Sequence, residues 1–226
     1  MKLSIVIPFY NEENMIQKMY DALVAEINKI TKAEFEIIFI NDGSKDRTFE
    51  KMLAIADSDS RVKYISFSRN FGKEAGTIAG LEYATGEAVI LMDGDLQHPP
   101  ALLPQMIEAY EQGYDVVSAR RTRTGEKPHR TFLAKHFYRL ANKMMDIELM
   151  DGVSEFRLFS RKAVRAILSL QEYNRFSKGI FSWIGFKEKV IEYENQVRTV
   201  GETKYSLKFS LNYAIQGILS FNDKPL

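Results

Sequence analysis

Two aspartates one glycine apart follow an apolar run in the segment MDGDLQHPP, Met92 to Pro100. Asp93, Asp95 and Gln97 carry oxygen atoms, and oxygen ligands are what Mg²⁺ and Mn²⁺ prefer, commonly in a site shared with a substrate phosphate. Asp and Gly are also the residues with which a chain leaves a strand, so a plain turn is the alternative. The segment alone favours the turn, and the choice depends on what the rest of the chain places beside it.

Similar polar clusters follow three other apolar runs of strand length. The runs are Leu3 to Ile7, Phe35 to Ile40, Val62 to Ser66 and Ala88 to Met92, and the clusters after them are Pro8 to Glu12, Asn41 to Ser44, Arg69 to Lys73 and Asp93 to Gln97. Four polar strand ends of this kind are expected to line one crevice, because ligands of an open α/β sheet bind outside the carboxyl ends of its strands.

Helical patterns separate these runs. They are predicted at about 10–30, 48–56, 73–84 and 100–112, and a fifth strand is predicted at about 115–119. Strands that alternate with helices indicate an α/β fold, with a mostly parallel, Rossmann-like sheet flanked by helices on both faces.

The composition excludes several classes of protein. The 226 residues, 45% of them hydrophobic, are expected to form one domain with a C-terminal extension. With 31 basic and 30 acidic residues the formal charge is +1, which argues against nucleic-acid binding through overall charge. The absence of cysteine excludes disulfides and thiolate catalysis and favours a reducing, cytosolic location.

Other local signals are weak. His98 is expected in the loop after the fourth strand, and His129 and His136 on the surface, because their spacing matches no metal site. The first apolar run is too short for a signal peptide, and no run approaches the roughly 20 apolar residues of a membrane span. The chain as given is therefore expected to be soluble.

Taken together and in order, four segments resemble a known family. IVIPFYNEE, FINDGSKD, SRNFGKEAG and LMDGDLQHPP are similar to the nucleotide-binding half of a family 2 glycosyltransferase with the GT-A fold. The most similar group is that of the dolichol-phosphate mannosyltransferase-like enzymes, which includes bacterial polyprenyl-phosphate glycosyltransferases. The resemblance covers nearly the whole chain and implies a GT-A catalytic domain over residues 1–205.

The resemblance implies roles for the clusters on the donor side. The residues expected to hold the nucleoside are Pro8, Tyr10, Asn11, Glu12 and Asp42. Asp93, Asp95 and Gln97 become a site for Mg²⁺ or Mn²⁺, with Asp95 as the more direct ligand, and Gly94 leaves room for the sugar diphosphate. Arg69 and Lys73 flank the donor as cations. Without the neighbouring motifs, a turn before a helix is the preferred interpretation of Asn41 to Ser44, and an ordinary solvated face is that of Arg69 and Lys73.

A segment further along, Asp151 to Leu158 (DGVSEFRL), resembles the acceptor-side motif of the family. Glu155 stands where relatives usually have Asp before Phe-Arg, so its role as catalytic base is in question. A lipid phosphate has a second pKa of about 6, so it is already mostly ionised at neutral pH. As a nucleophile it needs correct placement more than removal of a proton. Glu155 is then expected to orient Arg157 or the bound donor. The alternative is a charge at a strand edge that pairs with Arg157.

Basic residues and an amphipathic segment complete the expected site. Arg198 and Lys204 match a mobile phosphate-binding loop of the family, and a second basic loop is a predicted lid, with a merely solvated loop as the alternative. The basic residues of that second loop are Arg120, Arg121, Arg123, Lys127 and Arg130. Residues 206–226 are expected to form an amphipathic juxtamembrane segment, which fits either core packing or a membrane surface. Relatives commonly continue from there into transmembrane helices.

The predicted function is that of an inverting, metal-dependent glycosyltransferase. It moves glucose or N-acetylglucosamine, with mannose as a further option, from a nucleotide-diphosphate sugar, UDP-linked by preference, to polyprenyl phosphate at the cytoplasmic membrane face. One alternative is transfer to a sugar or protein hydroxyl, for which Glu155 or Asp151 would have to act as a base. The other is a non-catalytic nucleotide-sugar-binding module. Homo-oligomerisation is left open.

Overall fold

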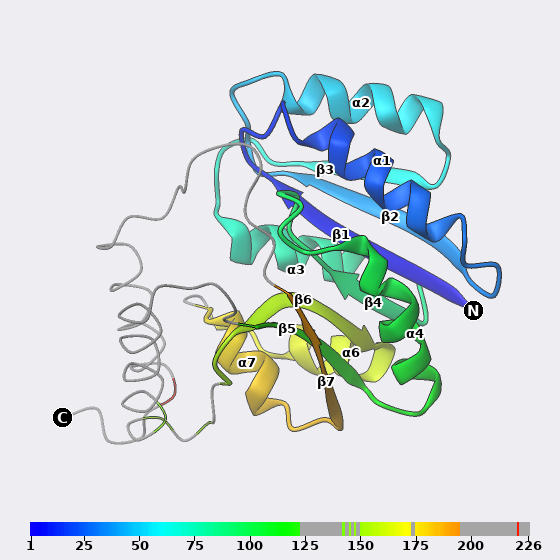
Figure 1. Cartoon of the computed structure of the whole chain (residues 1–226). Coiled ribbons are helices and arrows are strands. Elements are labelled where there is room, and N and C mark those ends of the chain that lie inside the picture. Colours follow the sequence, from blue (N-terminus) through cyan, green and yellow to red (C-terminus); the bar gives the residue numbers. More distant parts are fainter. Residues whose placement is uncertain are drawn as a thin grey trace.

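The computed structural model describes residues 1–122, 150–172 and 175–194, together with Asn142, Met145, Ile147 and Phe221. Within these residues seven strands form one sheet in the order β3-β2-β1-β4-β6-β5-β7 (Figure 1). The strands are β1 (Lys2–Phe9), β2 (Glu34–Asn41), β3 (Val62–Ser66), β4 (Ala88–Leu91), β5 (Val116–Arg121), β6 (Val153–Ser160) and β7 (Glu188–Tyr193). Only β6 is antiparallel to its neighbours, β4 and β5, so the predicted mostly parallel sheet is confirmed.

Helices cover both faces of the sheet. One face carries α1 (Ile16–Ile27), α2 (Thr48–Ser58) and α4 (Leu103–Glu111), and the other carries α3 (Lys73–Tyr83), α6 (Arg161–Ser169) and α7 (Ser177–Trp183) (Figure 1). Alternation along β1 divides the core accordingly, because Ile5 and Ile7 pack towards α1 whereas Val6 packs towards α3. A short 3-10 helix, η1 (Pro100–Leu102), precedes α4. No helix in the described part is both long and apolar enough to cross a bilayer.

The helix predicted from Tyr10 onward begins later than expected. Asn11 has a positive φ of 51°, which interrupts a helix, and α1 starts only at Ile16. The intervening turn is tied to the segment after β2, since the backbone N–H of Asn11 donates to Ser44 Oγ at 3.0 Å and that of Lys45 donates to Asn11 Oδ1 at 2.8 Å. The other predicted helices and strands lie within a few residues of their expected bounds, and β6 and β7 were not predicted as strands.

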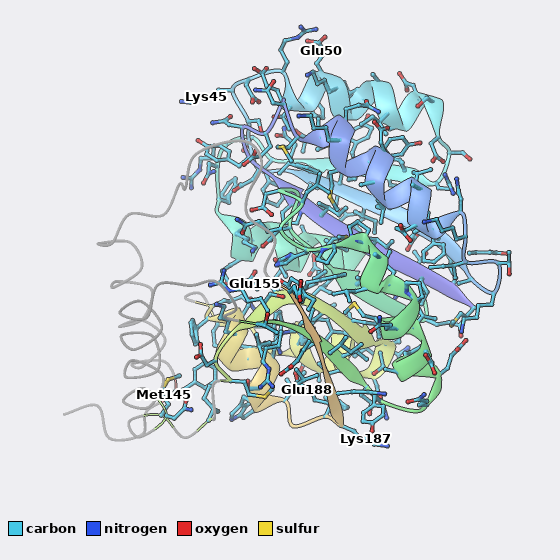
Figure 2. All side chains as sticks on the ribbon, viewed as in Figure 1. Lys45, Glu50, Met145, Glu155, Lys187 and Glu188 are labelled. Carbon is cyan, nitrogen blue, oxygen red and sulfur yellow. The ribbon has the colours of Figure 1, made fainter. Side chains whose placement is uncertain are left out.

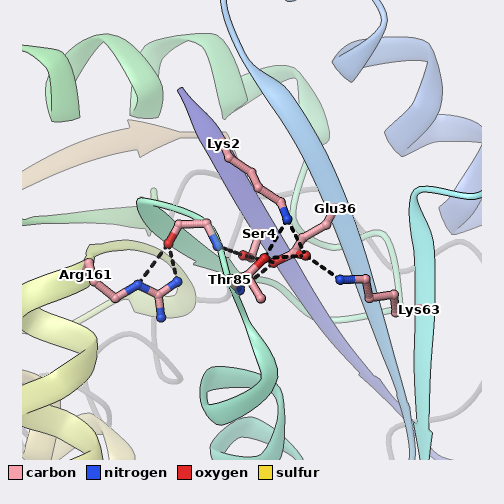
Figure 3. Close-up of polar contacts among 7 residues, drawn as sticks. Lys2, Ser4, Glu36, Lys63, Thr85 and Arg161 are labelled. Carbon is pink, nitrogen blue, oxygen red and sulfur yellow. Dashed lines mark hydrogen bonds and ion pairs between the residues drawn. The ribbon is translucent and has the colours of Figure 1, made fainter.

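A buried carboxylate stabilises the edge of the sheet where β1 and β2 begin (Figure 3). Glu36, 3% exposed, accepts hydrogen bonds from Ser4 Oγ at 2.5 Å, Lys63 Nζ at 2.9 Å and the backbone N–H of Thr85 at 2.6 Å. Burial by itself would raise the pKa of Glu36, but these donors lower it well below its usual value. This network lies at the edge opposite the predicted crevice and belongs to the framework of the fold.

Candidate active site

The predicted polar clusters meet at the carboxyl edge of the sheet. The last residues of β1, β2 and β3 are register partners, Phe9 with Asn41 and Asn41 with Ser66. The antiparallel strand β6 enters the sheet from this same edge, because Arg157 pairs with Leu91 at the end of β4. Glu155, two residues earlier, therefore lies beside the loop that carries the two aspartates, near the middle of the molecule (Figure 2).

Lys73 joins two of the predicted site carboxylates. Its ammonium lies 2.5 Å from Asp93 Oδ1 and 2.7 Å from Glu155 Oε2, so the start of α3, the β4 loop and β6 converge on one ion-pair cluster. Burial alone would lower the pKa of Lys73, but the two carboxylates outweigh it and raise that pKa well above its usual value. Burial alone would raise the pKa of Asp93. The charge of the Lys73 ammonium outweighs burial and lowers that pKa.

His98 packs against β6 and accepts a hydrogen bond from the backbone of this loop. Its ring is buried and stacked on Phe156 at a centroid distance of 5.5 Å, and the backbone N–H of Asp93 donates to its Nδ1 at 3.3 Å. Burial lowers the pKa of His98, which favours the neutral ring that can accept this hydrogen bond at Nδ1. The predicted loop position is confirmed, and the burial identifies His98 as a residue that positions Asp93.

Gly94 is explained by a neighbour that the sequence does not reveal. A Cβ atom at position 94 would lie 2.3 Å from Cε1 of Phe9, a ring that is 2% exposed. Packing against Phe9 therefore requires the glycine, whatever space a ligand needs. The loop then turns through Leu96, whose φ is 58°, and the backbone N–H of Gln97 donates to Asp95 Oδ1 at 3.1 Å.

The donor set of this loop suits a hard cation shared with a ligand. Among the described residues no three His, Cys, Asp or Glu side chains are grouped to hold a metal ion. Asp93 and Asp95 could supply two carboxylates and Gln97 an amide oxygen, which leaves positions for phosphate or water oxygens. Asp93 already contacts one cation, the Lys73 ammonium, so its surroundings accommodate positive charge.

A cleft of about 500 Å³ opens beside the ends of β1, β2 and β3. Tyr10 and Arg69 are among its lining residues, together with Asn41, Phe49 and the polar segment from Gly43 to Lys45. This volume and the mixture of rings and polar groups suit a small organic ligand such as a nucleoside. The guanidinium of Arg69 lies 4.4 Å from the centre of the Phe71 ring.

Four of the residues expected to hold the nucleoside are not among the residues that line this cleft. Of the described residues, Pro8, Asn11, Glu12 and Asp42 do not line it. Asp42 is 4% exposed and accepts hydrogen bonds from the backbone N–H groups of Phe71 at 2.7 Å and Gly72 at 3.0 Å, and its burial raises its pKa. Asp42 thus holds the segment that leads into Lys73.

Arg157 and Glu155 do not form the pair that the sequence suggested. The ion-pair partner of Glu155 within the described residues is Lys73, and that of Arg157 is Glu188 at 3.6 Å. The guanidinium of Arg157 is buried, 5.2 Å from the centre of the Phe181 ring, and Nε donates to the carbonyl oxygen of Ser154. Burial lowers its pKa. The expectation that Glu155 orients Arg157 is therefore corrected to an interaction with Lys73.

Lys178 is a site residue that the sequence did not indicate. It follows Ser177 at the start of α7, and its charge acts on Asp93 while the charges of Glu155, Lys73 and Arg157 act on it. Only the packing of α7 onto the sheet, a contact between distant parts of the chain, brings it there. Arg198, Lys204, Arg123, Lys127 and Arg130 lie outside the described residues. Arg120 pairs with Glu192.

The chain is similar in sequence to known proteins. A sequence model described as "Glycosyl transferase family 2" matches residues 4–168. The putative glycosyltransferase CsbB of Bacillus subtilis (strain 168) is 50% identical over 224 residues, which are 99% of this chain and 68% of that protein. The prophage bactoprenol glucosyl transferase homolog of Escherichia coli (strain K12) is 43% identical over 227 residues, covering 100% of this chain and 74% of that protein.

Solved structures with the same fold are more distant in sequence. The mannosyltransferase PcManGT from Pyrobaculum calidifontis, in complex with GDP-Man and Mn²⁺, superposes with a TM-score of 0.67 at 16% identity, covering 95% of this chain and 62% of that chain. Glucosyl-3-phosphoglycerate synthase from Mycobacterium tuberculosis, in complex with Mn²⁺, UDP and glucosyl-3-phosphoglycerate, gives 0.58 at 18% identity, covering 97% and 79%. With a GT-A fold and a family match over most of its length, the chain belongs to glycosyl transferase family 2 and is a glycosyltransferase.

Proposed function

We propose that the protein transfers glucose from a UDP-sugar to polyprenyl phosphate, with inversion at the anomeric carbon and with Mg²⁺ or Mn²⁺ as cofactor. The observation that supports this proposal most directly is the ion-pair cluster of Lys73, Asp93 and Glu155. It joins the aspartate loop to β6 next to a cleft of nucleoside size. Relatives 43% identical to this chain are named bactoprenol glucosyl transferases, which supports a lipid phosphate acceptor and glucose as the sugar.

The reaction forms one bond and breaks one. An oxygen of the acceptor phosphate attacks the anomeric carbon of the sugar, the bond from that carbon to the diphosphate breaks, and UDP leaves with the bonding electron pair. A divalent cation held by Asp93, Asp95 and Gln97 would supply Lewis-acid stabilisation of the charge on the departing diphosphate. The same charge would be met by the Lys73 ammonium.

Glu155 suits an ionised acceptor better than a hydroxyl acceptor. Glu155 Oε2 accepts the Lys73 ammonium at 2.7 Å, a contact that suits a positioning role. A phosphomonoester is mostly dianionic at neutral pH and needs no general base. In this scheme Glu155 holds Lys73 in place beside Asp93 and acts as a positioning residue.

The membrane is the expected location of the acceptor, since a polyprenyl chain partitions into a bilayer. Residues 1–205 are proposed as the catalytic domain and 206–226 as a segment that lies on the cytoplasmic membrane surface. Phe221, the described residue of that segment, packs on α7, with its ring 6.3 Å from the ring of Phe176.

A donor screen tests the proposal. The full chain is incubated with undecaprenyl phosphate, Mn²⁺ or Mg²⁺, and UDP-glucose, UDP-N-acetylglucosamine or GDP-mannose, and lipid-linked sugar is measured. Metal-dependent product is expected with UDP-glucose above the other donors. Product with undecaprenol or with a sugar acceptor in place of the phosphate would favour the hydroxyl alternative. Donor binding without product on any acceptor would indicate a binding module.

A further inference from the structure

Two lysines far apart in the sequence are brought to the same site by a contact between α3 and α7. Ser177 is 2% exposed, its backbone N–H donates to Glu74 Oε1 at 3.2 Å, and its hydroxyl donates to Glu74 Oε2, across 103 residues of sequence. Glu74 follows Lys73 in the first turn of α3, and Lys178 follows Ser177 in α7. The two hydrogen bonds therefore fix the starts of both helices, and with them both lysines, beside Glu155.

Lys178 has no direct partner among the described residues, unlike the other two cations beside Glu155. Lys73 uses Asp93 and Glu155 as partners, and Arg157 uses Glu188. No described side chain gives Lys178 a hydrogen bond or an ion pair, although Glu155, Lys73, Arg157 and Arg121 are near enough to act on its charge. Burial lowers the pKa of Lys178, and the three neighbouring cations add to that effect against the opposing influence of Glu155. An anion bound here would give the Lys178 ammonium the partner that the described residues do not supply.

The position of α7 in the fold separates this anion from the nucleotide. The nucleoside-sized cleft lies at the ends of β1, β2 and β3, and the aspartate loop follows β4, the next strand in the sheet. The helix α7 approaches from beyond β4, because its Phe181 packs on Phe159 of β6 at a centroid distance of 4.8 Å. Lys178 thus comes from a helix that contacts β6, the strand on the other side of β4 from the cleft.

The same helix also contacts the C-terminal segment. Phe221 packs so closely on α7 that a Cβ atom at Gly179 would lie 2.4 Å from its ring. Gly179 is the residue next to Lys178, so the helix that carries Lys178 also contacts Phe221, which belongs to the segment proposed to lie on the membrane.

We propose that Lys178 binds the phosphate of the prenyl phosphate acceptor, across Glu155 from the donor diphosphate. The inference rests on the proposed function and adds a residue to it. A phosphomonoester carries a charge of about −1.5 to −2 at neutral pH, and an ammonium group is a strong donor for its oxygens. The acceptor phosphate then lies between Lys178 and the sugar, while Lys73 serves the donor, so the two phosphate groups have separate cations.

Binding of a short, water-soluble acceptor tests this role directly. Farnesyl phosphate, farnesol and inorganic phosphate are titrated by calorimetry into the full chain with UDP and Mn²⁺ present. K178M is expected to weaken farnesyl phosphate binding by at least about tenfold through loss of a charge-assisted hydrogen bond, and K178R to restore most of it. Farnesol binding and UDP affinity are expected to stay as in the wild type. Tighter binding of farnesyl phosphate than of inorganic phosphate identifies the lipid-linked group as the ligand.

The matched control is K187M, which removes the same charge from an exposed lysine just before β7, far from Glu155 (Figure 2). In turnover with undecaprenyl phosphate, K178M is expected to raise the KM for the acceptor more than it lowers kcat. Wild-type farnesyl phosphate affinity in folded K178M, as judged by circular dichroism, would overturn the inference and leave the proposed function intact. A drop in UDP affinity equal to the drop in acceptor affinity would assign Lys178 to the donor and also overturn it. A wild-type protein that binds UDP but no prenyl phosphate would contradict both proposals.

Discussion

Lys73 supplies the site with a cation before any ligand binds. Its ammonium contacts Asp93 at 2.5 Å and Glu155 at 2.7 Å. In the proposed site, a divalent cation held by Asp93 would compete with Lys73 for the same oxygen. A bound diphosphate would give Lys73 another partner and release that oxygen. Metal and nucleotide are therefore expected to strengthen each other's binding, by the reciprocity that holds for any two coupled ligands.

Replacing Lys73 by methionine separates these two effects. K73M is expected to tighten Mn²⁺ binding in the absence of nucleotide by about tenfold, or about 1.4 kcal/mol, because Asp93 and Glu155 lose their internal counter-ion. K73M is also expected to weaken UDP binding in the presence of Mn²⁺, because the diphosphate loses a cation. Electron paramagnetic resonance of free Mn²⁺ measures the first change, and calorimetry measures the second.

Two further variants serve as controls for this measurement. K187M removes an exposed lysine and should leave both affinities unchanged. D95N should lose Mn²⁺ binding and turnover, because an amide offers no negative charge to the cation. If K73M binds Mn²⁺ no more tightly than the wild type, Lys73 and the metal do not compete. If D95N keeps Mn²⁺ binding and activity, the aspartate segment is only a turn.

Glu155→Gln distinguishes positioning from base catalysis. Glutamine keeps an oxygen that can accept a hydrogen bond from Lys73 but cannot take a proton, so a positioning role predicts a loss in kcat smaller than about 100-fold, whereas loss of a general base costs about 10² to 10⁴. The remaining rate should still rise with pH through about 6, as the acceptor phosphate ionises. Glu50→Gln, at an exposed glutamate of α2, is the control. Absence of product at every pH, with normal UDP binding, would move the preferred acceptor to a hydroxyl.

At the scale of elements, the loop between β4 and η1 depends on a ring from β1. The Phe9 ring packs edge-on against Phe39 at a centroid distance of 5.3 Å and leaves no room for a side chain at Gly94. The geometry of Asp93 and Asp95 is therefore linked to the packing of the core beneath them.

Gly94→Ala tests that link. Because the added methyl group would displace a buried ring, the variant is expected to lose about 1–3 kcal/mol in free energy of unfolding and to bind Mn²⁺ more weakly with UDP present. Gly76→Ala in α3 is the control, since its Cβ would lie 3.4 Å from Pro8 Cβ and alanine favours a helix. Urea unfolding and Mn²⁺ titration measure the two effects. Wild-type stability in the Gly94 variant would show that the ring moves aside at little cost.

The central strands could be predicted from the sequence, and the antiparallel strand could not. β4 is a continuous apolar run, and β2 contains one from Ile37 to Ile40, which is the pattern of strands buried on both faces. β6 contains Glu155 and Arg157 within its first five residues, and β7 begins with Glu188, so neither has that pattern. The aspartate loop could be predicted because it directly follows the apolar run of β4. Its contact with Lys73 and Glu155 could not, because it depends on the register of β6 against β4, which are distant in the sequence.

At the scale of the whole molecule, the two ends of the parallel strands hold separate networks of charged residues. The carboxyl edge holds the site, where Lys178 has no partner within the described residues. The opposite edge holds Glu36, whose carboxylate is saturated with hydrogen bonds and also lies 3.2 Å from Lys2 Nζ (Figure 3). Glu36 contacts no residue of the site in this network, so a change there should alter stability without altering ligand binding.

The pH dependence of stability has a defined sign at Glu36. Its pKa is lower in the folded protein than its value of about 4.3 in an unfolded chain. The stabilisation is therefore fully present above about pH 5 and is lost as the pH falls below about 4 towards the folded-state pKa, because the unfolded chain takes up the proton first.

Glu36→Gln should reveal this contribution at the scale of the whole fold. The neutral amide leaves its buried hydrogen-bond donors incompletely paired, so the variant is expected to lose about 2–3 kcal/mol in free energy of unfolding at pH 7, with unchanged affinity for UDP and Mn²⁺. The difference from the wild type should shrink between about pH 5 and pH 3, as the wild type loses its advantage. Urea unfolding at stepped pH measures both, with exposed Glu34→Gln as the control. A difference in free energy of unfolding that stays constant down to about pH 3 would contradict this prediction. It would assign the loss to packing, because a packing contribution does not change with pH whereas the contribution of an ionised carboxylate does.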